Sequence, residues 1–243
     1  MSTEVPERPA QIGLLCTVWK LLGRHGLVDG IFNHISCSFG GSEGELRIAI
    51  SPAERLSSEL ASEEIRDLPL RAYSEVEAKQ LGVNPDGLQL HTSVHLARQR
   101  PGYVVHLHPP HCVAVGATEV GLLPLNQTAI EFAEGLLMVD YEGLARSWLL
   151  PPQLSALALT GGEALLRNHG LLVVADTPAE AFYACYYMEV ACRLQVLTLA
   201  QGIPVHTPDV ETVKATAGAL RADRKGAATA MYEAMQRLAS ESQ

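Results

Sequence analysis

The chain has 243 residues, 47% of them hydrophobic and 19% charged, and its formal net charge is −9. This length fits one large domain or two small ones and allows a substantial core. The negative charge argues against nucleic acid or an anionic membrane as a partner, and no apolar run reaches the roughly 18 residues that cross a bilayer. A small-molecule substrate is the expected partner.

The first third of the chain predicts a helix followed by a hairpin. Apolar residues at three- and four-residue steps predict a helix over 10–26. Two short strands, 31–39 and 46–50, flank a glycine-rich turn. Ser51-Pro52-Ala53-Glu54 has the capping-box pattern, so a short helix is expected directly after it. Residues 72–81 fit either a strand or a helix.

The rest of the chain alternates between helices and strands. Asn84-Pro85-Asp86-Gly87 predicts a loop, and residues 161–166 fit a helix or the start of a strand. Helical periodicity predicts helices over 88–98, 113–118, 151–159, 179–201 and 210–240. Strands are predicted over 103–108 and 171–175. The helix over 179–201 is apolar nearly all round, so we expect it to be buried and to be the longest helix of the chain.

We expect a single α/β domain over residues 1–243, because no repeat or low-complexity linker divides it. Residues 1–9 are polar, lack a signal-peptide pattern and are expected to be disordered, and residues 203–243 form a C-terminal helical extension. The five cysteines are scattered among apolar residues and are expected to be buried, reduced thiols: Cys16, Cys37, Cys112, Cys185 and Cys192. These features favour a cytoplasmic location.

Three histidines occur in two short phrases that predict a metal site. His106 and His108 lie two residues apart on the predicted strand 103–108, so both imidazoles leave the same face. His169 precedes Gly170 and the buried strand 171–175. Three imidazoles with one open position are typical of catalytic zinc. Manganese, cobalt or iron are the other divalent ions considered.

Two simpler interpretations of these histidines stay open. Each could be an ordinary polar residue at the end of a strand. A closed structural zinc site is less expected, because such sites usually contain paired cysteines, and the chain has no Cys-x-x-Cys motif. Cys112 is the cysteine nearest in sequence to this cluster, and packing is its expected role.

Six short motifs in order resemble the class II aldolase/adducin family. They span roughly residues 14–202 and are Asn33-His34-Ile35-Ser36, Ile50-Ser51-Pro52, Asn84-Pro85-Asp86-Gly87 with His91, Val105-His106-Leu107-His108, Tyr141-Glu142-Gly143 and Asn168-His169-Gly170-Leu171. The resemblance implies a three-layer α/β/α fold with a mostly antiparallel central sheet. It also implies a divalent metal held by His106, His108 and His169, and a homotetramer with sites at subunit interfaces.

The departures from the family pattern bear on the substrate. Sugar-phosphate aldolases of this family carry Gly-Asn in the first phosphate loop, where this chain has Asn33 and His34. Glu54 would place a negative charge in the second loop. The family glutamate that acts as general acid/base is replaced by Gly87, with Asp86 beside it. The resemblance therefore implies a substrate without phosphate.

The resemblance also places other candidate residues near the substrate. His34 and Asp86 are the candidate acid/base groups, because an imidazole or a carboxylate can move a proton near neutral pH. The alternatives are a loop histidine bonded to backbone and an aspartate that only shapes its turn. Asn33, Ser51 and Gly87 are the candidate substrate contacts. His91 is interpreted as a hydrogen-bonded core residue rather than a support for the site, and His95 is assigned no function.

The leading functional hypothesis is a metal-dependent carbon–carbon lyase. It would act by aldol cleavage or decarboxylation on a small, non-phosphorylated oxo- or hydroxy-acid, aromatic acids included. One alternative on the same scaffold is an iron-dependent oxygenase. The other is a non-catalytic interaction module, as adducins are, although the three metal histidines argue against it. Arg221, Arg224 and Lys225 would either supply a cation for a carboxylate substrate or form a solvated helix face.

Overall fold

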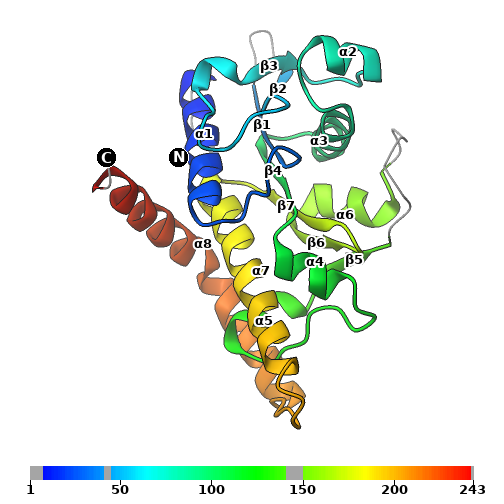
Figure 1. The fold of residues 1–243 in the computed structure, drawn as a ribbon, viewed down its shortest axis with the longest axis vertical. Helices are drawn as coiled ribbons and strands as arrows, with labels where there is room; N and C mark the ends of the chain where they lie inside the picture. The colour runs from blue at the N-terminus through cyan, green and yellow to red at the C-terminus, as the bar shows by residue number, and fades with distance from the viewer. Residues whose placement is uncertain (1–7, 41–44, 141–149, 242–243) are drawn as a thin grey trace.

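The computed structural model describes residues 8–40, 45–140 and 150–241. A seven-stranded sheet forms its centre, in the order β3-β2-β1-β4-β7-β6-β5 (Figure 1). The strands are β1 (His34–Gly40), β2 (Leu46–Ile50), β3 (Arg66–Pro69), β4 (Gly102–Leu107), β5 (Leu137–Val139), β6 (Gly162–Leu166) and β7 (Gly170–Ala175). All neighbouring strands are antiparallel except β5 and β6. The predicted mostly antiparallel sheet is confirmed.

Helices cover both faces of the sheet, so the predicted three-layer α/β/α fold is also confirmed (Figure 1). One face carries α1 (Arg8–Arg24), α4 (Pro110–Gly116), α5 (Gln127–Ala133), α7 (Pro178–Leu199) and α8 (Val210–Glu241). The other carries α2 (Glu75–Gln80), α3 (Pro85–Arg98) and α6 (Pro152–Thr160). A 3-10 turn, η2 (Ser62–Glu64), precedes β3.

The alternation of side chains along β4 divides the core into two layers and positions the site. Tyr103, Val105 and Leu107 pack into the large apolar cluster shared with α1 and α7. Val104 points to the other face, among residues of α3 and α6. Because successive residues of a strand alternate, His106 lies on the same face as Val104. The candidate metal ligand His106 therefore faces α3.

Two local predictions are wrong for identifiable reasons. No helix follows Ser51: the Ala53 N–H donates to the carbonyl of Gly82 at 2.8 Å, and Glu54 has a φ of 59°, a left-handed conformation that breaks a helix. Asn84-Pro85-Asp86-Gly87 is the start of α3 rather than a loop. The Asn84 side chain accepts a hydrogen bond from the Gly87 N–H at 2.9 Å, because residues that favour turns also cap helices.

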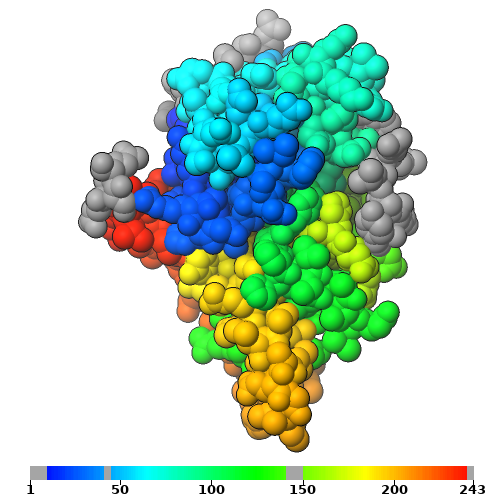
Figure 2. Space-filling model, viewed as in Figure 1, coloured from blue at the N-terminus to red at the C-terminus, as the bar shows by residue number. Residues whose placement is uncertain are grey.

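Both predicted C-terminal helices are confirmed, but the expectation that the helix over 179–201 is the longest is wrong. The longest described helix is α8, with 32 residues, whereas α7 has 22. Together the end of α7 and the start of α8 form a tip that projects from the body (Figure 2). It carries exposed apolar side chains: Leu197, Leu199, Ile203 and Val210. Among the described residues, no helix is long and apolar enough to cross a membrane.

The ambiguous segments and the cysteines are also placed. Residues 72–81 contain the helix α2, and residues 161–166 contain the strand β6. All five cysteines are buried and free, as predicted. Arg8 and Pro9 belong to α1, while residues 1–7 lie outside the described residues. The motif Tyr141-Glu142-Gly143 lies outside them as well.

Candidate metal centre

The sheet brings the three predicted metal histidines together. Strands β4 and β7 are antiparallel, with Leu107 opposite Leu171. His108 directly follows β4 and His169 directly precedes β7, so the two residues meet at one end of this strand pair. One ligand nitrogen from each of His106, His108 and His169 lies within 4.8 Å of the others. A single strand pairing thus brings together histidines that are about sixty residues apart in sequence.

The orientation of the imidazoles fits a shared cation. The Nδ1 of His106 lies 3.1 Å from the carbonyl oxygen of Leu171, so its proton is donated there and Nε2 is left bare. That Nε2 lies 3.1 Å from the Nε2 of His108. Two zinc ligands in a tetrahedron are separated by about 3.3 Å when each bond is about 2.0–2.1 Å. Two nitrogens at this spacing need a cation or a proton between them.

Tight backbone packing places the other two rings. Asn168 has a φ of 56°, which turns the chain between β6 and β7 and presents His169. At Gly170 a Cβ atom would lie 2.3 Å from the carbonyl oxygen of Leu107 and 2.8 Å from the His108 ring. Only glycine allows β7 to begin this close to His108. Each residue of the Asn-His-Gly motif therefore has a role: Asn168 turns the chain, His169 presents its imidazole and Gly170 leaves room for the neighbouring strand.

The electrostatic environment keeps the three imidazoles neutral. Burial lowers the pKa of His106 well below its ordinary value, and neighbouring histidines lower it further. Burial is also the main cause of the lowered pKa values of His108 and His169. A divalent metal binds the neutral imidazole, so each of these shifts favours binding at neutral pH.

Asn33 fixes the backbone of His108 through a hydrogen bond. Its side-chain oxygen accepts a hydrogen bond from the His108 N–H at 2.9 Å, and its side-chain nitrogen donates to the carbonyl of Asp29. Asn33 is only 4% exposed. Its predicted contact with substrate stays untested, and the structure shows that both ends of the amide already bind backbone.

His34 lies beside the triad and contacts Gly87. In the β1–β4 pairing His34 is opposite His106, and the two rings stack with centroids 5.7 Å apart. Neither ring nitrogen of His34 has a hydrogen-bond partner among the described residues, and burial lowers its pKa to about 4. A Cβ atom at Gly87 would lie 2.8 Å from the His34 ring. The absence of a side chain at 87 therefore makes room for the imidazole at 34.

The two remaining predicted residues flank this pair. The Ser51 hydroxyl accepts the N–H of Ile35 at 3.2 Å, which fixes the backbone next to His34. Among the described residues, no acceptor is bonded to the hydroxyl's own proton. Asp86 is half-buried in the first turn of α3, next to Gly87. Among the described residues, Asp86 forms no ion pair or hydrogen bond with the triad.

Replacing Asn33 by alanine is expected to weaken zinc binding by roughly 10- to 100-fold, the usual cost of losing a group that orients a metal ligand. The His108 backbone loses its acceptor, while the three imidazoles remain. Titration calorimetry of the metal-free protein with zinc measures the change. Asn126→Ala is the matched control, because its amide caps α5 and contacts no metal histidine. Equal zinc affinities for Asn33→Ala and wild type would contradict this role.

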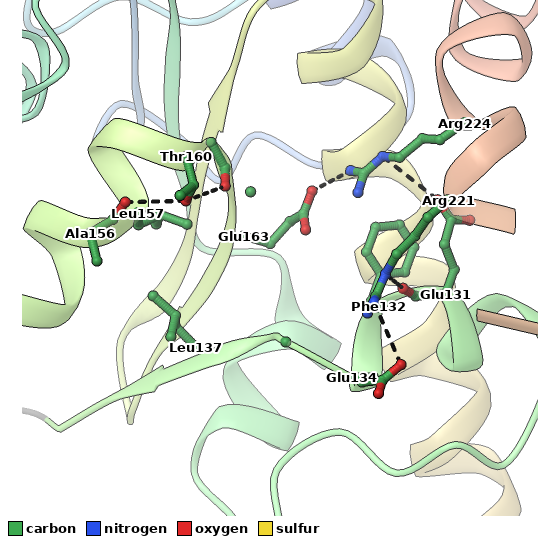
Figure 3. Close-up of a pocket in the computed structure, with 13 residues that line it drawn as sticks. Glu131, Phe132, Glu134, Leu137, Ala156, Leu157, Thr160, Glu163, Arg221 and Arg224 are labelled. Atoms are coloured by element: carbon green, nitrogen blue, oxygen red, sulfur yellow. Dashed lines mark hydrogen bonds and ion pairs between the residues drawn. The ribbon is translucent and has the colours of Figure 1, made fainter. Parts of the chain in front are cut away.

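A separate cavity of about 330 Å³ lies at the other end of β6 (Figure 3). Figure 3 shows Arg224 between Glu163 and Glu131, and ion pairs join it to both. Arg221 pairs with Glu134 at 3.5 Å. None of the lining residues belongs to the triad. Arg224 therefore balances two buried glutamates, whereas Arg221 and Lys225 are exposed, as on the predicted solvated helix face.

Comparisons with known proteins agree with this geometry. Residues 13–196 match the family model described as the class II aldolase and adducin N-terminal domain. The chain belongs to the class II aldolase and adducin family. A Caulobacter vibrioides protein provisionally named a class 2 aldolase is 35% identical over 190 residues, which cover 77% of this chain and 72% of the relative.

Two further matches are an adducin and a protein of known crystal structure. Rat alpha-adducin is 31% identical over 194 residues, 76% of this chain but only 25% of the adducin. A crystal structure of an aldolase II superfamily protein from Pseudomonas syringae has a TM-score of 0.84 at 24% identity, covering 99% of this chain and 96% of that one. This structural likeness shows the shared fold alone.

Proposed function

We propose that the protein is a metal-dependent carbon–carbon lyase acting on a small, non-phosphorylated oxo- or hydroxy-acid, by aldol cleavage or decarboxylation. The observation that carries the proposal is the cluster of three neutral imidazoles with ligand nitrogens within 4.8 Å of one another. His106, His108 and His169 would hold the ion, with zinc the expected metal and manganese, cobalt or iron the alternatives. When bound, such an ion supplies Lewis-acid polarisation of a carbonyl or carboxylate oxygen.

The side chains beside the triad support a substrate without phosphate. Asn33 and His34 carry no cation, because the amide is neutral and burial holds the pKa of His34 at about 4. Gly87 contributes no side chain. A phosphate group is usually bound by arginine, lysine or a cluster of backbone N–H groups. A single carboxylate or carbonyl needs fewer donors, which neutral imidazoles and the Ser51 hydroxyl can provide.

His34 is the proposed proton-transfer group of the site. It lies against His106, and both of its ring nitrogens are free of hydrogen-bond partners among the described residues. A neutral imidazole in this position accepts a proton from a substrate hydroxyl or donates one to a developing carbanion. Asp86, one residue before Gly87, is the second candidate. Ser51 and Gly87 are the proposed substrate contacts.

The interaction-module alternative has its own support. The chain is 31% identical to rat alpha-adducin over 194 residues. Such a module needs no metal, so the triad would have no reason to converge. The convergence of the three histidines thus favours the lyase.

Metal analysis of wild type and of three variants tests the proposal. Wild type is expected to bind about one equivalent of a divalent ion per chain, as three-histidine sites do. His106→Ala, His108→Ala and His169→Ala should each lose it. His206→Ala is the control, since His206 is exposed. The metal-loaded protein is then assayed against a panel of oxo- and hydroxy-acids, where carbon–carbon cleavage by wild type and none by the three variants is expected.

The other outcomes of this experiment discriminate between the alternatives. One equivalent of zinc without turnover of any acid would contradict the lyase assignment. Bound iron together with oxygen uptake would favour the oxygenase. A protein that binds no metal even on reconstitution would leave the adducin-like module.

The assembly is a related proposal. We expect a homotetramer with sites at subunit interfaces. Apolar side chains on the tip formed by α7 and α8 support association, because exposed apolar surface of this kind usually lies in an interface. Light scattering of the purified protein measures the assembled mass, and a monomer would contradict the expectation.

A further inference from the structure

A column of buried polar side chains runs along α3, from the candidate metal centre near Gly87 to Arg98 at the other end of the helix. On β1, His34, Ser36 and Ser38 lie on one face, opposite His106, Val104 and Gly102 of β4. Helix α3 crosses this face: Gly87 contacts His34, and the Arg98 side chain approaches Gly102. Between these ends lie His91 and His95. Both are fully buried, and neither takes part in the metal triad.

Ser36 bridges the two helical histidines. Its hydroxyl oxygen lies 2.6 Å from Nδ1 of His91 and 2.8 Å from Nε2 of His95. The other nitrogen of each ring, Nε2 of His91 and Nδ1 of His95, is buried and has no hydrogen-bond partner among the described residues. The three side chains therefore form a linear chain with one unpaired nitrogen at each end.

The serine couples the tautomers of the two rings, because a hydroxyl has only one proton to donate. If Ser36 donates to His91, it must accept from His95, and both neutral rings then carry their proton on Nε2. If Ser36 donates to His95, both rings carry it on Nδ1. Burial lowers the pKa of His95 to about 3 and that of His91 well below its ordinary value, so both rings are neutral at pH 7. A mixed pair in which both facing nitrogens are bare would break one of the two hydrogen bonds. A mixed pair in which both rings donate to Ser36 would keep both, but would leave the Ser36 proton without an acceptor among the described residues.

Arg98 selects between the two arrangements. Its guanidinium is buried at the far end of the column, donates to the carbonyl oxygen of Ala158 at 3.1 Å and pairs with the exposed carboxylate of Asp176. Its positive charge also lowers the pKa of His95. A bare nitrogen at Nδ1 of His95 is attracted to this cation, whereas an N–H there would be repelled. The favoured form has the proton on Nε2 of His95, which donates to Ser36, which in turn donates to His91.

We propose that Ser36 and Arg98 hold His91 and His95 in the same Nε2–H tautomer, so that His91 presents a fixed N–H donor at the metal-centre end of the column. Nδ1 of His91 is turned to Ser36, so Nε2 is on the other side of the ring, and the ring edge packs against His34 with centroids 5.9 Å apart. This donor suits an oxygen acceptor, such as the carboxylate or carbonyl of an acid. That last assignment rests on the proposed lyase function; the tautomers do not.

Nuclear magnetic resonance of protein labelled with ¹⁵N at histidine tests the proposal, because long-range ¹H–¹⁵N correlations show which ring nitrogen carries the proton. The metal-free and zinc-loaded proteins are both measured, and His91→Gln and His95→Gln assign the signals. We expect the Nε2–H form for both residues. The Nδ1–H form for both would overturn the role of Arg98, and different tautomers would overturn the coupling of the two rings through Ser36.

Substitutions at Ser36 provide the second readout. Ser36→Ala removes the bridge, so His91 is expected to populate both tautomers, while Ser36→Thr keeps the hydroxyl and the single form. Ser38→Ala is the matched control, because Ser38 is two residues along the same strand and bonds the carbonyl of Arg100 instead. An unchanged His91 spectrum in folded Ser36→Ala would overturn the proposal. If Ser36→Ala does not fold, the wild-type tautomers still decide.

Titration of the zinc-loaded protein with pyruvate, a simple oxo-acid, addresses the donor. We expect the Nε2–H proton signal of His91 to shift on binding and that of His95 to remain in place. Pyruvate that shifts the His169 signals but leaves His91 unmoved would overturn the donor role. Failure of pyruvate and of every other acid to bind would count against the proposed function, while the tautomers would still report on the column.

Discussion

Acidification from about pH 7.5 to about pH 5.5 is expected to destabilise the metal-free protein by about 5 kcal/mol. Four fully or nearly fully buried histidines carry this effect: His34, His91, His95 and His106. Burial lowers all four pKa values, to about 4 for His34 and about 3 for His95. Each costs about 1.4 kcal/mol at one pH unit below the unfolded pKa of about 6.5.

The sign follows from which state binds protons. Below about pH 6.5 the unfolded chain protonates these histidines, whereas the folded protein keeps them neutral until the pH approaches their lowered pKa values. The unfolded state therefore binds more protons, and stability that is complete above pH 6.5 is lost as the pH falls. Glu131 opposes this trend, because burial raises its pKa and the folded state binds its proton more readily. Glu131 is outweighed, because the lowered pKa values of His108 and His169 act in the same direction as those of the four buried histidines.

Urea unfolding in the presence of a chelator, at both pH values, measures the loss. His95→Gln removes one of the four groups and should reduce the pH dependence by about 1.4 kcal/mol. His206→Gln is the control, since His206 is exposed and should leave the pH dependence unchanged. Equal stability of the wild type at the two pH values would show that these histidines are not buried and neutral.

The metal centre was predictable because its signals are local. His106 and His108 share a strand face by the two-residue repeat, and Asn168, His169 and Gly170 show the turn and the close strand approach in three adjacent residues. Neither segment, 106–108 or 168–170, indicates by itself that the two strands pair. The order of family-like motifs supplied that long-range part, and the structure shows the resulting geometry.

The buried column was not predictable, because its members are far apart in sequence. Ser36 is 55 residues from His91 and 59 from His95. Taken alone, His91 and His95 are polar residues on one side of a helix. Only the packing of α3 on β1 brings them to a shared hydroxyl. The interpretation of His91 as a hydrogen-bonded core residue holds for its Nδ1 and fails for its Nε2.

The wrong predictions also have a common physical cause. A capping-box pattern at Ser51 and a turn pattern at Asn84 use the same residue types, since both place a short polar side chain before a proline. Whether a helix or a loop forms depends on which acceptors the next backbone N–H groups bond. At Ala53 the N–H donates to Gly82, outside any helix, and at Gly87 it donates to the Asn84 side chain.

Gly87→Ala is expected to reduce stability by about 1–3 kcal/mol and to displace His34 from its stacked position against His106. The added Cβ would lie 2.8 Å from three atoms of the His34 ring, within a fully packed layer. Alanine is otherwise the better helix residue, by up to about 1 kcal/mol. A loss of stability therefore reports the contact with His34 and not the helix.

The decisive test compares the change in stability caused by Gly87→Ala in wild-type protein and in His34→Ala protein. In His34→Ala protein the clash is absent, so Gly87→Ala should become neutral or stabilising by up to about 1 kcal/mol. The coupling between the two sites is then about 1–4 kcal/mol, of the order found for residues in contact. Gly226→Ala in α8 is the control, because no neighbouring atom lies within 4 Å of its added Cβ, and it should behave alike in both backgrounds. If Gly87→Ala has the same effect with and without His34, the two positions are independent, and the proposal that an imidazole at 34 occupies the space left by residue 87 is wrong.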